Sequence, residues 1–224
     1  MKNFSFLILF IFTLCHSIFS QNLVEKINGL RNYYNLSMSD TSVCNKILFF
    51  NIFPDNFSEF QTIYGYNDSF DSIEYSPLYL EAAEHICFFC SLSNIIPLKQ
   101  YYRKMIDIAI NGHWQADAIS HFQSCLFDHV LLESDTVIFY YNSANHDSII
   151  YFINPAQEVS ETLLSVLETY KDEDIASFWH FYFDKSPMST EFSNVYYKKT
   201  CKMLVEYPRL YTIMIKEFKK QYDN

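Results

Sequence analysis

The sequence predicts a mainly α-helical fold, a single-domain multi-helix array that resembles a bundle, with one β-hairpin near residues 136–153. Three observations predict it. Apolar residues recur at three- and four-residue steps through most of the chain, which is the period of an amphipathic helix. Proline and glycine stand at the ends of these segments, where helices begin and end. Half of the 224 residues are hydrophobic and 19% are aromatic, a composition typical of a chain that buries a core.

The first helices are delimited by proline and glycine. Residues 41–53 and 56–64 have helical spacing, with Pro54 between them, and Gly65 ends the second. We expect the next helix to begin at Pro77, because proline is favoured in the first turn of a helix. Its apolar stripe recurs at helical steps through Leu78, Ala82, Ile86 and Phe89.

The same spacing continues in four later segments. Pro97 opens a helix that Gly112 is expected to end. Residues 114–130 follow, with an apolar or aromatic residue at every fourth position. Two further helices are expected at residues 159–170 and 208–222, and the second of these is basic.

Residues 136–153 depart from helical spacing. Thr136–Tyr141 and Ser148–Ile153 are β-branched and aromatic runs on either side of a polar stretch that is typical of a turn. This pattern predicts a β-hairpin, and a pair of helices is the alternative.

The N-terminus has the features of a secretory signal peptide, which we expect to cover residues 1–20. Lys2 precedes an apolar run from Phe4 to Leu14, and either Ser17 or Ser20 can be the small residue before the cleavage site. Cleavage predicts an exported protein, periplasmic or extracellular, with no stable membrane insertion.

The remaining residues, 21–224, are expected to form the single helical domain. The alternative to cleavage is that the uncharged residues 3–22 are retained and anchor an accessory protein in a membrane.

Five cysteines would remain after cleavage, an odd number that permits at most two disulfides. Cys87 and Cys90 form a C-x-x-C motif, but they lie in the middle of a predicted helix. A redox motif needs a helix N-terminus to lower the thiol pKa, so we interpret this motif as a packed pair that a disulfide can bridge. The five residues are Cys44, Cys87, Cys90, Cys125 and Cys201.

Charge indicates the kind of partner. The chain carries 26 Asp and Glu against 16 Lys and Arg, a net charge of −10, so it repels phosphates and we expect no nucleic acid partner. A basic protein would suit this charge. Residues 195–224 are the exception, with seven Lys and Arg against three acids. We interpret this basic end as docking on the acidic remainder; a role at a membrane surface is the alternative.

Glycine is scarce, with only Gly29, Gly65 and Gly112 in the whole chain. Dinucleotide-binding loops, phosphate-binding loops and nucleophile elbows need clustered glycine, because the backbone adopts positive φ or approaches the ligand closely there. The sequence therefore excludes these three kinds of site.

Asp117 and His121 stand one helical turn apart, and Trp114 is a turn before Asp117. An acid and an imidazole can perform general acid–base catalysis in a cleft, but no recognisable nucleophile accompanies this pair. We therefore favour a structural hydrogen bond from Asp117 that anchors residues 112–114.

A zinc site is also conceivable, since His121, Cys125 and His129 share one row of a predicted helix and Cys87 and Cys90 lie on another. The row extends about 12 Å, which is too far for its three side chains to bind one ion. We expect no metal, no cofactor and no catalytic residue.

Residues 178–184 form the densest aromatic block of the sequence. A segment that is apolar on nearly all sides is usually buried, so we interpret it as core. If its rings are exposed, they would anchor a protein interface, because buried Trp and Tyr dominate interface energetics. The candidate binding residues are Trp114, Asp117, His121, Phe178, Trp179, Phe181, Phe183 and Asp184.

Two motifs, Ile110-Asn-Gly-His-Trp-Gln-Ala-Asp-Ala118 and Ser177-Phe-Trp-His-Phe-Tyr-Phe-Asp184, give the chain a family resemblance. It resembles a family of uncharacterised exported bacterial proteins with "ING-x-W-x-ADA" and "SFW-x-F-x-FD" motifs, over most of residues 45–190. The chain departs from that family at residues 136–154 and lacks a glycine after Asp184. The resemblance implies an immunity-like binding role and no catalytic residue.

Together these observations predict an exported protein-binding module, an immunity or adaptor protein without catalysis, whose partner is a basic protein. A hydrolytic enzyme of unfamiliar type that uses Asp117 and His121 is the first alternative, and a membrane-anchored accessory protein is the second. A binding module should expose a contiguous apolar patch, whereas an enzyme should have a deep pocket with converging titratable groups.

Overall fold

The structure is a computed structural model, and its chain divides into two compact units, residues 1–53 and residues 54–224, which are described separately. The sequence had indicated one domain over residues 21–224, and the signal peptide expected at residues 1–20 lies outside the described residues. The structure describes residues 22–40, 42–69, 72–115, 117–131, 137–142, 147–152, 156–184 and 190–222.

The described residues of the first unit form two helices, one at residues 22–39 and α2 at Val43–Ile52. They approach so closely that a Cβ added to Gly29 would lie 2.8 Å from Cδ1 of Ile52, which explains a glycine inside a helix. The rings of Tyr34 and Phe49 pack between the two helices with centroids 6.4 Å apart.

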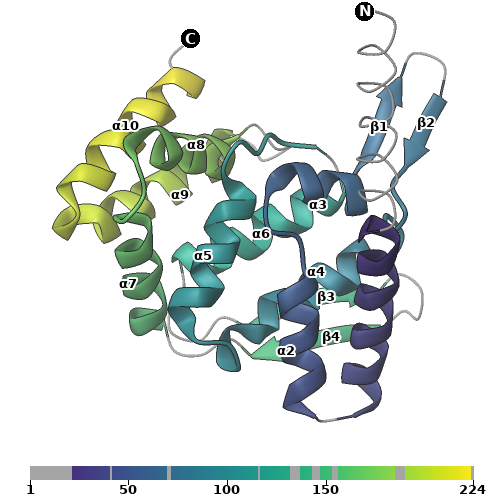
Figure 1. Cartoon of the computed structure of the whole chain (residues 1–224). Helices are drawn as coiled ribbons and strands as arrows, with labels where there is room; N and C mark the ends of the chain where they lie inside the picture. Colours follow the sequence, from purple (N-terminus) through teal and green to yellow (C-terminus); the bar gives the residue numbers. More distant parts are fainter. Residues whose placement is uncertain are drawn as a thin grey trace, which may run out of the picture. The chain divides into compact units, whose positions relative to one another are not determined.

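The second unit is mainly helical, which confirms the predicted fold class (Figure 1). The β1–β2 hairpin projects at one end of this unit, and α8, α9 and α10 gather at the other. Its elements are α3 (Phe57–Tyr64), β1 (Tyr66–Ser69), β2 (Ser72–Tyr75), α4 (Ala82–Ser91), α5 (Leu98–Ala109), α6 (Ala118–Leu131), β3 (Val137–Asn142), β4 (Asp147–Phe152), α7 (Ala156–Leu167), α8 (Asp172–Phe183), α9 (Thr190–Met203) and α10 (Pro208–Tyr222), with short 3₁₀ turns at Leu92–Asn94 and Leu204–Glu206.

The hairpin predicted near residues 136–153 is confirmed, and the alternative pair of helices is wrong. β3 and β4 pair antiparallel, with Val137 opposite Phe152 and Asn142 opposite Asp147. A second hairpin, β1–β2, was not predicted; it pairs Tyr66 with Tyr75.

The helix expected to begin at Pro77 begins instead at Ala82. The preceding residues form turns, because their backbone bonds to the end of α3: the amide of Ser76 donates to the carbonyl of Gly65 at 3.0 Å, and the amide of Leu78 donates to Ile63 at 2.9 Å. These bonds fix the exit of the hairpin and delay the helix.

The basic C-terminal helix α10 packs along α8, as docking of the basic end on the acidic remainder requires. The guanidinium of Arg209 donates to the backbone carbonyls of Glu168 and Tyr170 at 2.8 and 2.7 Å and to the carboxylate of Asp172. At the other end of α10, the hydroxyl of Tyr222 donates to the carbonyl of Phe183 at 2.9 Å.

Candidate functional site

The two family-like motifs lie side by side, because the loop between α5 and α6 rests on α8. The amide of Asn111 donates to the hydroxyl of Ser177 at 2.7 Å, and the amide of Trp114 donates to the carboxylate of Asp184. From α6, the side-chain amide of the buried Gln123 donates to the carbonyl of Phe181 at 2.8 Å. These bonds explain the motifs as parts of one structural joint.

Gly112 is needed in this joint for space. A Cβ at Gly112 would lie 2.5 Å from Cδ2 of Phe181 and 2.8 Å from the carbonyl oxygen of Ala109. The left-handed residue that ends α5 is Asn111, with φ of 62°, and φ at Gly112 is not positive. The predicted end of the helix is thus correct, but Asn111 makes the turn.

We expect Gly112→Ala to lower the free energy of unfolding by about 2 kcal/mol, because the added methyl displaces Phe181 or the backbone of α5. Urea unfolding measures this loss. The control is Asn111→Gly, which should be tolerated because glycine adopts the positive φ of this position without steric cost. Equal stability of Gly112→Ala and the unmodified chain would contradict the close contact.

The aromatic block of α8 lies in the core, which agrees with its interpretation as core. Phe178, Trp179, Phe181 and Phe183 are all buried, the most exposed of them at 4%. Phe181 packs against Phe57 and Phe122, with ring centroids 6.0 and 6.2 Å away. Their burial removes these four residues from any surface that a partner could contact.

Asp117 holds the entrance of α6 and accepts a hydrogen bond from the hydroxyl of Tyr79. Asp117 is exposed and has φ of 61°, and its carbonyl accepts from the backbone amide of His121 at 2.9 Å. The carboxylate raises the pKa of the Tyr79 phenol well above its ordinary value through this hydrogen bond. The structural role expected of Asp117 is therefore seen, but its partner is Tyr79 instead of residues 112–114.

The proposed catalytic pair is not assembled. Among the described residues, no hydrogen bond joins the side chains of Asp117 and His121, and burial lowers the pKa of His121 below its ordinary value. The indole of Trp114 donates to the hydroxyl of Ser120 at 3.1 Å, so it also contributes to the joint.

An exposed aromatic surface surrounds Tyr79 instead. The rings of Tyr75 and Tyr66 lie 4.4 and 6.1 Å from the ring of Tyr79 between centroids. Ile73, Tyr75 and Leu80 are 52%, 59% and 90% exposed. We call this surface the tyrosine face, and it consists of Tyr66, Ile73, Tyr75, Tyr79 and Leu80.

The tyrosine face was missed from the sequence because it depends on the unpredicted β1–β2 hairpin. Tyr66 lies directly opposite Tyr75 in the register, and Ile73, two residues before Tyr75, shares its side of β2. The i, i+2 spacing of Ile73 and Tyr75 is the pattern in the sequence that indicates a strand here, but β2 has four residues, which are too few to predict a strand from alternation.

The tyrosine face lies in an acidic part of the chain. Residues 54–98 contain seven Asp and Glu and neither Lys nor Arg. Glu74 of β2 is exposed and stands between Ile73 and Tyr75, and Asp117 bonds to Tyr79. Aromatic rings and carboxylates in this combination attract cations.

A cavity of about 430 Å³, which we call the cup, opens beside the tyrosine face. Its wall contains the carboxylate of Glu74 and the side chain of Gln115, whose oxygen is buried and accepts no hydrogen bond from the described residues. The lining also includes Gln61, Tyr66, Asn67 and Tyr75.

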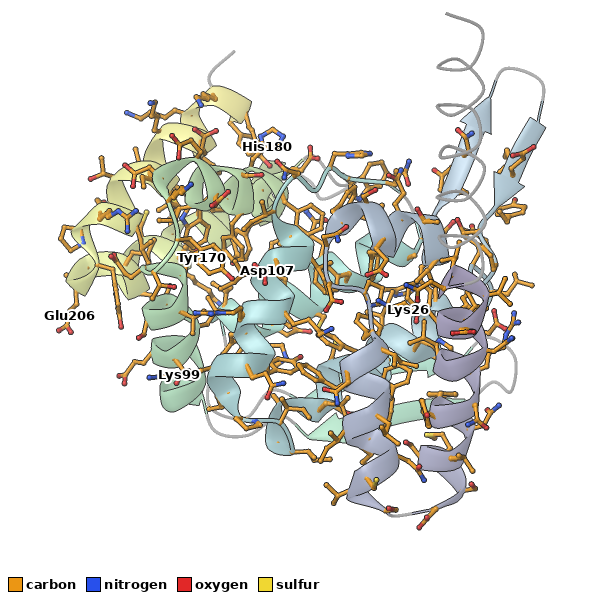
Figure 2. The ribbon with its side chains drawn as sticks, viewed as in Figure 1. Lys26, Lys99, Asp107, Tyr170, His180 and Glu206 are labelled. Atoms are coloured by element: carbon orange, nitrogen blue, oxygen red, sulfur yellow. A yellow bond between two sulfur atoms is a disulfide. The ribbon has the colours of Figure 1, made fainter. Side chains whose placement is uncertain are left out.

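A second cavity of about 440 Å³ lies between α5 and α7 and is basic, since Lys99 and Arg103 line it together with Ser165. Figure 2 shows Lys99 towards one end of α5 and Asp107 towards the other. Asp107 accepts a hydrogen bond of 2.7 Å from the hydroxyl of Tyr170, which joins α5 to the turn after α7 (Figure 2).

The row considered for zinc is used for other bonds. Cys125 forms a disulfide with Cys90, whose Cα atoms are 6.1 Å apart, so the motif cysteines Cys87 and Cys90 are not bridged to each other. Both ring nitrogens of the buried His129 lie within hydrogen-bond distance of tyrosine hydroxyls, at 3.2 Å from Tyr101 and 3.1 Å from Tyr102. Within the described part of the chain, no three His, Cys, Asp or Glu side chains converge on a metal position.

None of the helices in the described ranges is both long and apolar enough to cross a membrane. Comparison of the chain with known protein families, with curated proteins and with solved structures gives no match. The resemblance carried by the two motifs therefore stays a prediction.

Proposed function

We propose that this chain is an exported protein-binding module, of the immunity or adaptor kind, that binds a basic protein through the tyrosine face. The observation that carries this proposal is the exposure of Ile73 and Tyr75 on one side of β2, with the exposed Leu80 next to Tyr79 in the chain. Exposed apolar residues that gather in one patch are typical of interaction sites, and Tyr is enriched among the residues that dominate binding energy.

Charge supports a basic partner. The tyrosine face lies within a segment of seven acids and no Lys or Arg, Glu74 adjoins Tyr75 in β2, and Asp117 bonds to Tyr79. Opposite charges accelerate association, and a cation can also bind against the tyrosine rings.

The disulfide between Cys90 and Cys125 supports export. Structural disulfides form in oxidising compartments such as the periplasm or the extracellular space, and cytosolic reductants keep thiols reduced. Catalysis by Asp117 and His121 gains no support, because no hydrogen bond joins the two side chains among the described residues and neither lines the cup or the basic cavity.

The proposal is tested by capture from the native host at low and at high ionic strength. We expect one stoichiometric partner with a net positive charge, captured faster at low salt because screening weakens electrostatic steering. Recovery of an acidic partner, or of none at low salt, would contradict the proposal.

A further inference from the structure

We propose that the cup binds an arginine side chain of the basic partner. This inference rests on the proposed function and deepens it, because it assigns the chemical group that the site recognises. The cup is built from three parts of the chain that meet at one end of the second unit: α3, the β1–β2 hairpin and the loop before α6.

The first observation is an acceptor that the described residues leave unused. Gln115 lines the cup, and its side-chain oxygen is buried and accepts no hydrogen bond from any described residue. A buried polar atom without a partner is costly, and such atoms in native structures indicate a role that the free chain does not show. An oxygen can only accept a hydrogen bond, so the missing ligand group must be a donor.

The second observation is a carboxylate in the lining of the same cup. Glu74 also lines the cup, and no ion pair involves it among the described residues. The whole of residues 54–98 supplies no Lys or Arg that could neutralise it. The donor that suits both Glu74 and Gln115 is therefore cationic.

The third observation selects arginine over lysine. Tyr66 and Tyr75 both line the cup, so aromatic side chains form part of its wall. A guanidinium group is planar, stacks on aromatic faces and directs five N–H donors in a fixed fork, whereas an ammonium is a compact and strongly hydrated charge. A carboxylate, an amide oxygen and aromatic walls together fit the guanidinium.

The volume of the cup agrees with this occupant. Ligand pockets in proteins measure roughly 300–1,000 Å³, and the cup, at about 430 Å³, is at the small end of this range. It accommodates one long side chain that enters from a partner while the surrounding tyrosine face contacts the partner's surface.

The test uses two blocked tripeptides as probes, acetyl-Gly-Arg-Gly-amide and its citrulline counterpart, which keeps the shape of arginine without the charge. The full chain is labelled with ¹⁵N, and the side-chain amide resonances of Gln115 are followed during titration. We expect the arginine peptide to shift these resonances with a dissociation constant in the millimolar range and the citrulline peptide to bind at least roughly tenfold more weakly.

Matched variants locate the effect. Glu74→Gln removes the carboxylate of the cup, and we expect it to weaken the arginine peptide roughly tenfold. Glu84→Gln removes the same charge from α4, outside the cup, and should leave the affinity unchanged within about twofold. An arginine peptide that leaves the Gln115 resonances in place, or equal loss in both variants, would overturn the assignment.

The outcomes separate this inference from the proposed function. If the arginine peptide fails to bind but changes at Tyr75 and Leu80 still weaken capture of the partner, the tyrosine face stands and the arginine assignment is wrong. If the peptide binds the cup while no partner depends on the tyrosine face, the proposed function is wrong.

Discussion

Replacing both Cys90 and Cys125 by alanine is expected to lower the free energy of unfolding by about 4 kcal/mol. The disulfide joins α4 to α6 across a sequence separation of 35 residues, and a closed loop of this length restricts the unfolded chain by about that amount. Both sulfur atoms are in the core, so alanine introduces no polar group there. Urea unfolding in buffer without reductant measures the loss.

The control is Cys44→Ala, which removes an exposed thiol on α2 outside the disulfide and should leave stability within about 0.5 kcal/mol. Reductant should destabilise the unmodified chain as strongly as the double substitution does. Protein isolated from its host with Cys90 and Cys125 both reduced would count against this bond and against export.

The second large effect is a loss of folding stability at acidic pH, which is caused by His129 and offset in the unmodified chain by Asp128. Burial lowers the pKa of His129 to about 4, from 6.5 in the unfolded chain. Between these values the unfolded chain binds more protons, so the stability that neutral His129 provides is complete above pH 6.5 and is lost as the pH falls towards 4. The loss is about 3 kcal/mol.

Asp128 acts in the opposite direction. Burial raises its pKa to about 6, from 3.8, so in this window the folded chain binds more protons than the unfolded chain. The contribution of Asp128 to stability therefore increases as the pH falls from 6 to 3.8, by about 3 kcal/mol. The two neighbours largely compensate each other in the unmodified chain.

Asp128→Asn removes this compensation. We expect the variant to be more stable than the unmodified chain by about 3 kcal/mol at pH 7 and to lose about 3 kcal/mol between pH 7 and pH 4. Urea unfolding at pH 4, 5, 6 and 7 measures both. Glu173→Gln, at an exposed position on α8, should follow the unmodified chain. A variant curve parallel to the unmodified one would mean that His129 does not titrate in this window.

The helices could be predicted because their signals are local. Stripes at helical spacing predicted α5, α6, α7 and α10, and the β-branched runs predicted β3 and β4. The start of α4 could not be predicted, because it depends on bonds from Ser76 and Leu78 to the end of α3.

The β1–β2 hairpin was missed because Asn67 and Asp68 are residues that strands disfavour, so its pairing depends on context and not on propensity. The disulfide was missed because cysteine connectivity cannot be deduced from spacing. Cys90 is bonded to Cys125 of α6, and not to Cys87 of its own helix.

The candidate site was only partly predictable. Trp114 bonds to Asp184 and Ser120, and Asp117 bonds to Tyr79, so these candidate residues hold the loop before α6 in place, and neither the Trp114–Asp184 bond nor the Tyr79–Asp117 bond was predicted from the sequence. The aromatic residues of the block at 178–184, which stand out most in the sequence, are buried. A high density of aromatic residues is as typical of a core as of a binding surface. The tyrosine face appears only when the hairpin places Tyr66 beside Tyr75.

The affinity of the purified partner for two aspartate variants tests binding through the tyrosine face most directly. Leu80→Asp and Val205→Asp replace aliphatic residues that are 90% and 74% exposed, the first in the tyrosine face and the second beside α10. We expect Leu80→Asp to weaken binding roughly tenfold or more, because it places a hydrated charge in the apolar contact, and Val205→Asp to leave it unchanged. Equal affinities of the two variants, at equal thermal stability, would contradict binding of the partner through the tyrosine face.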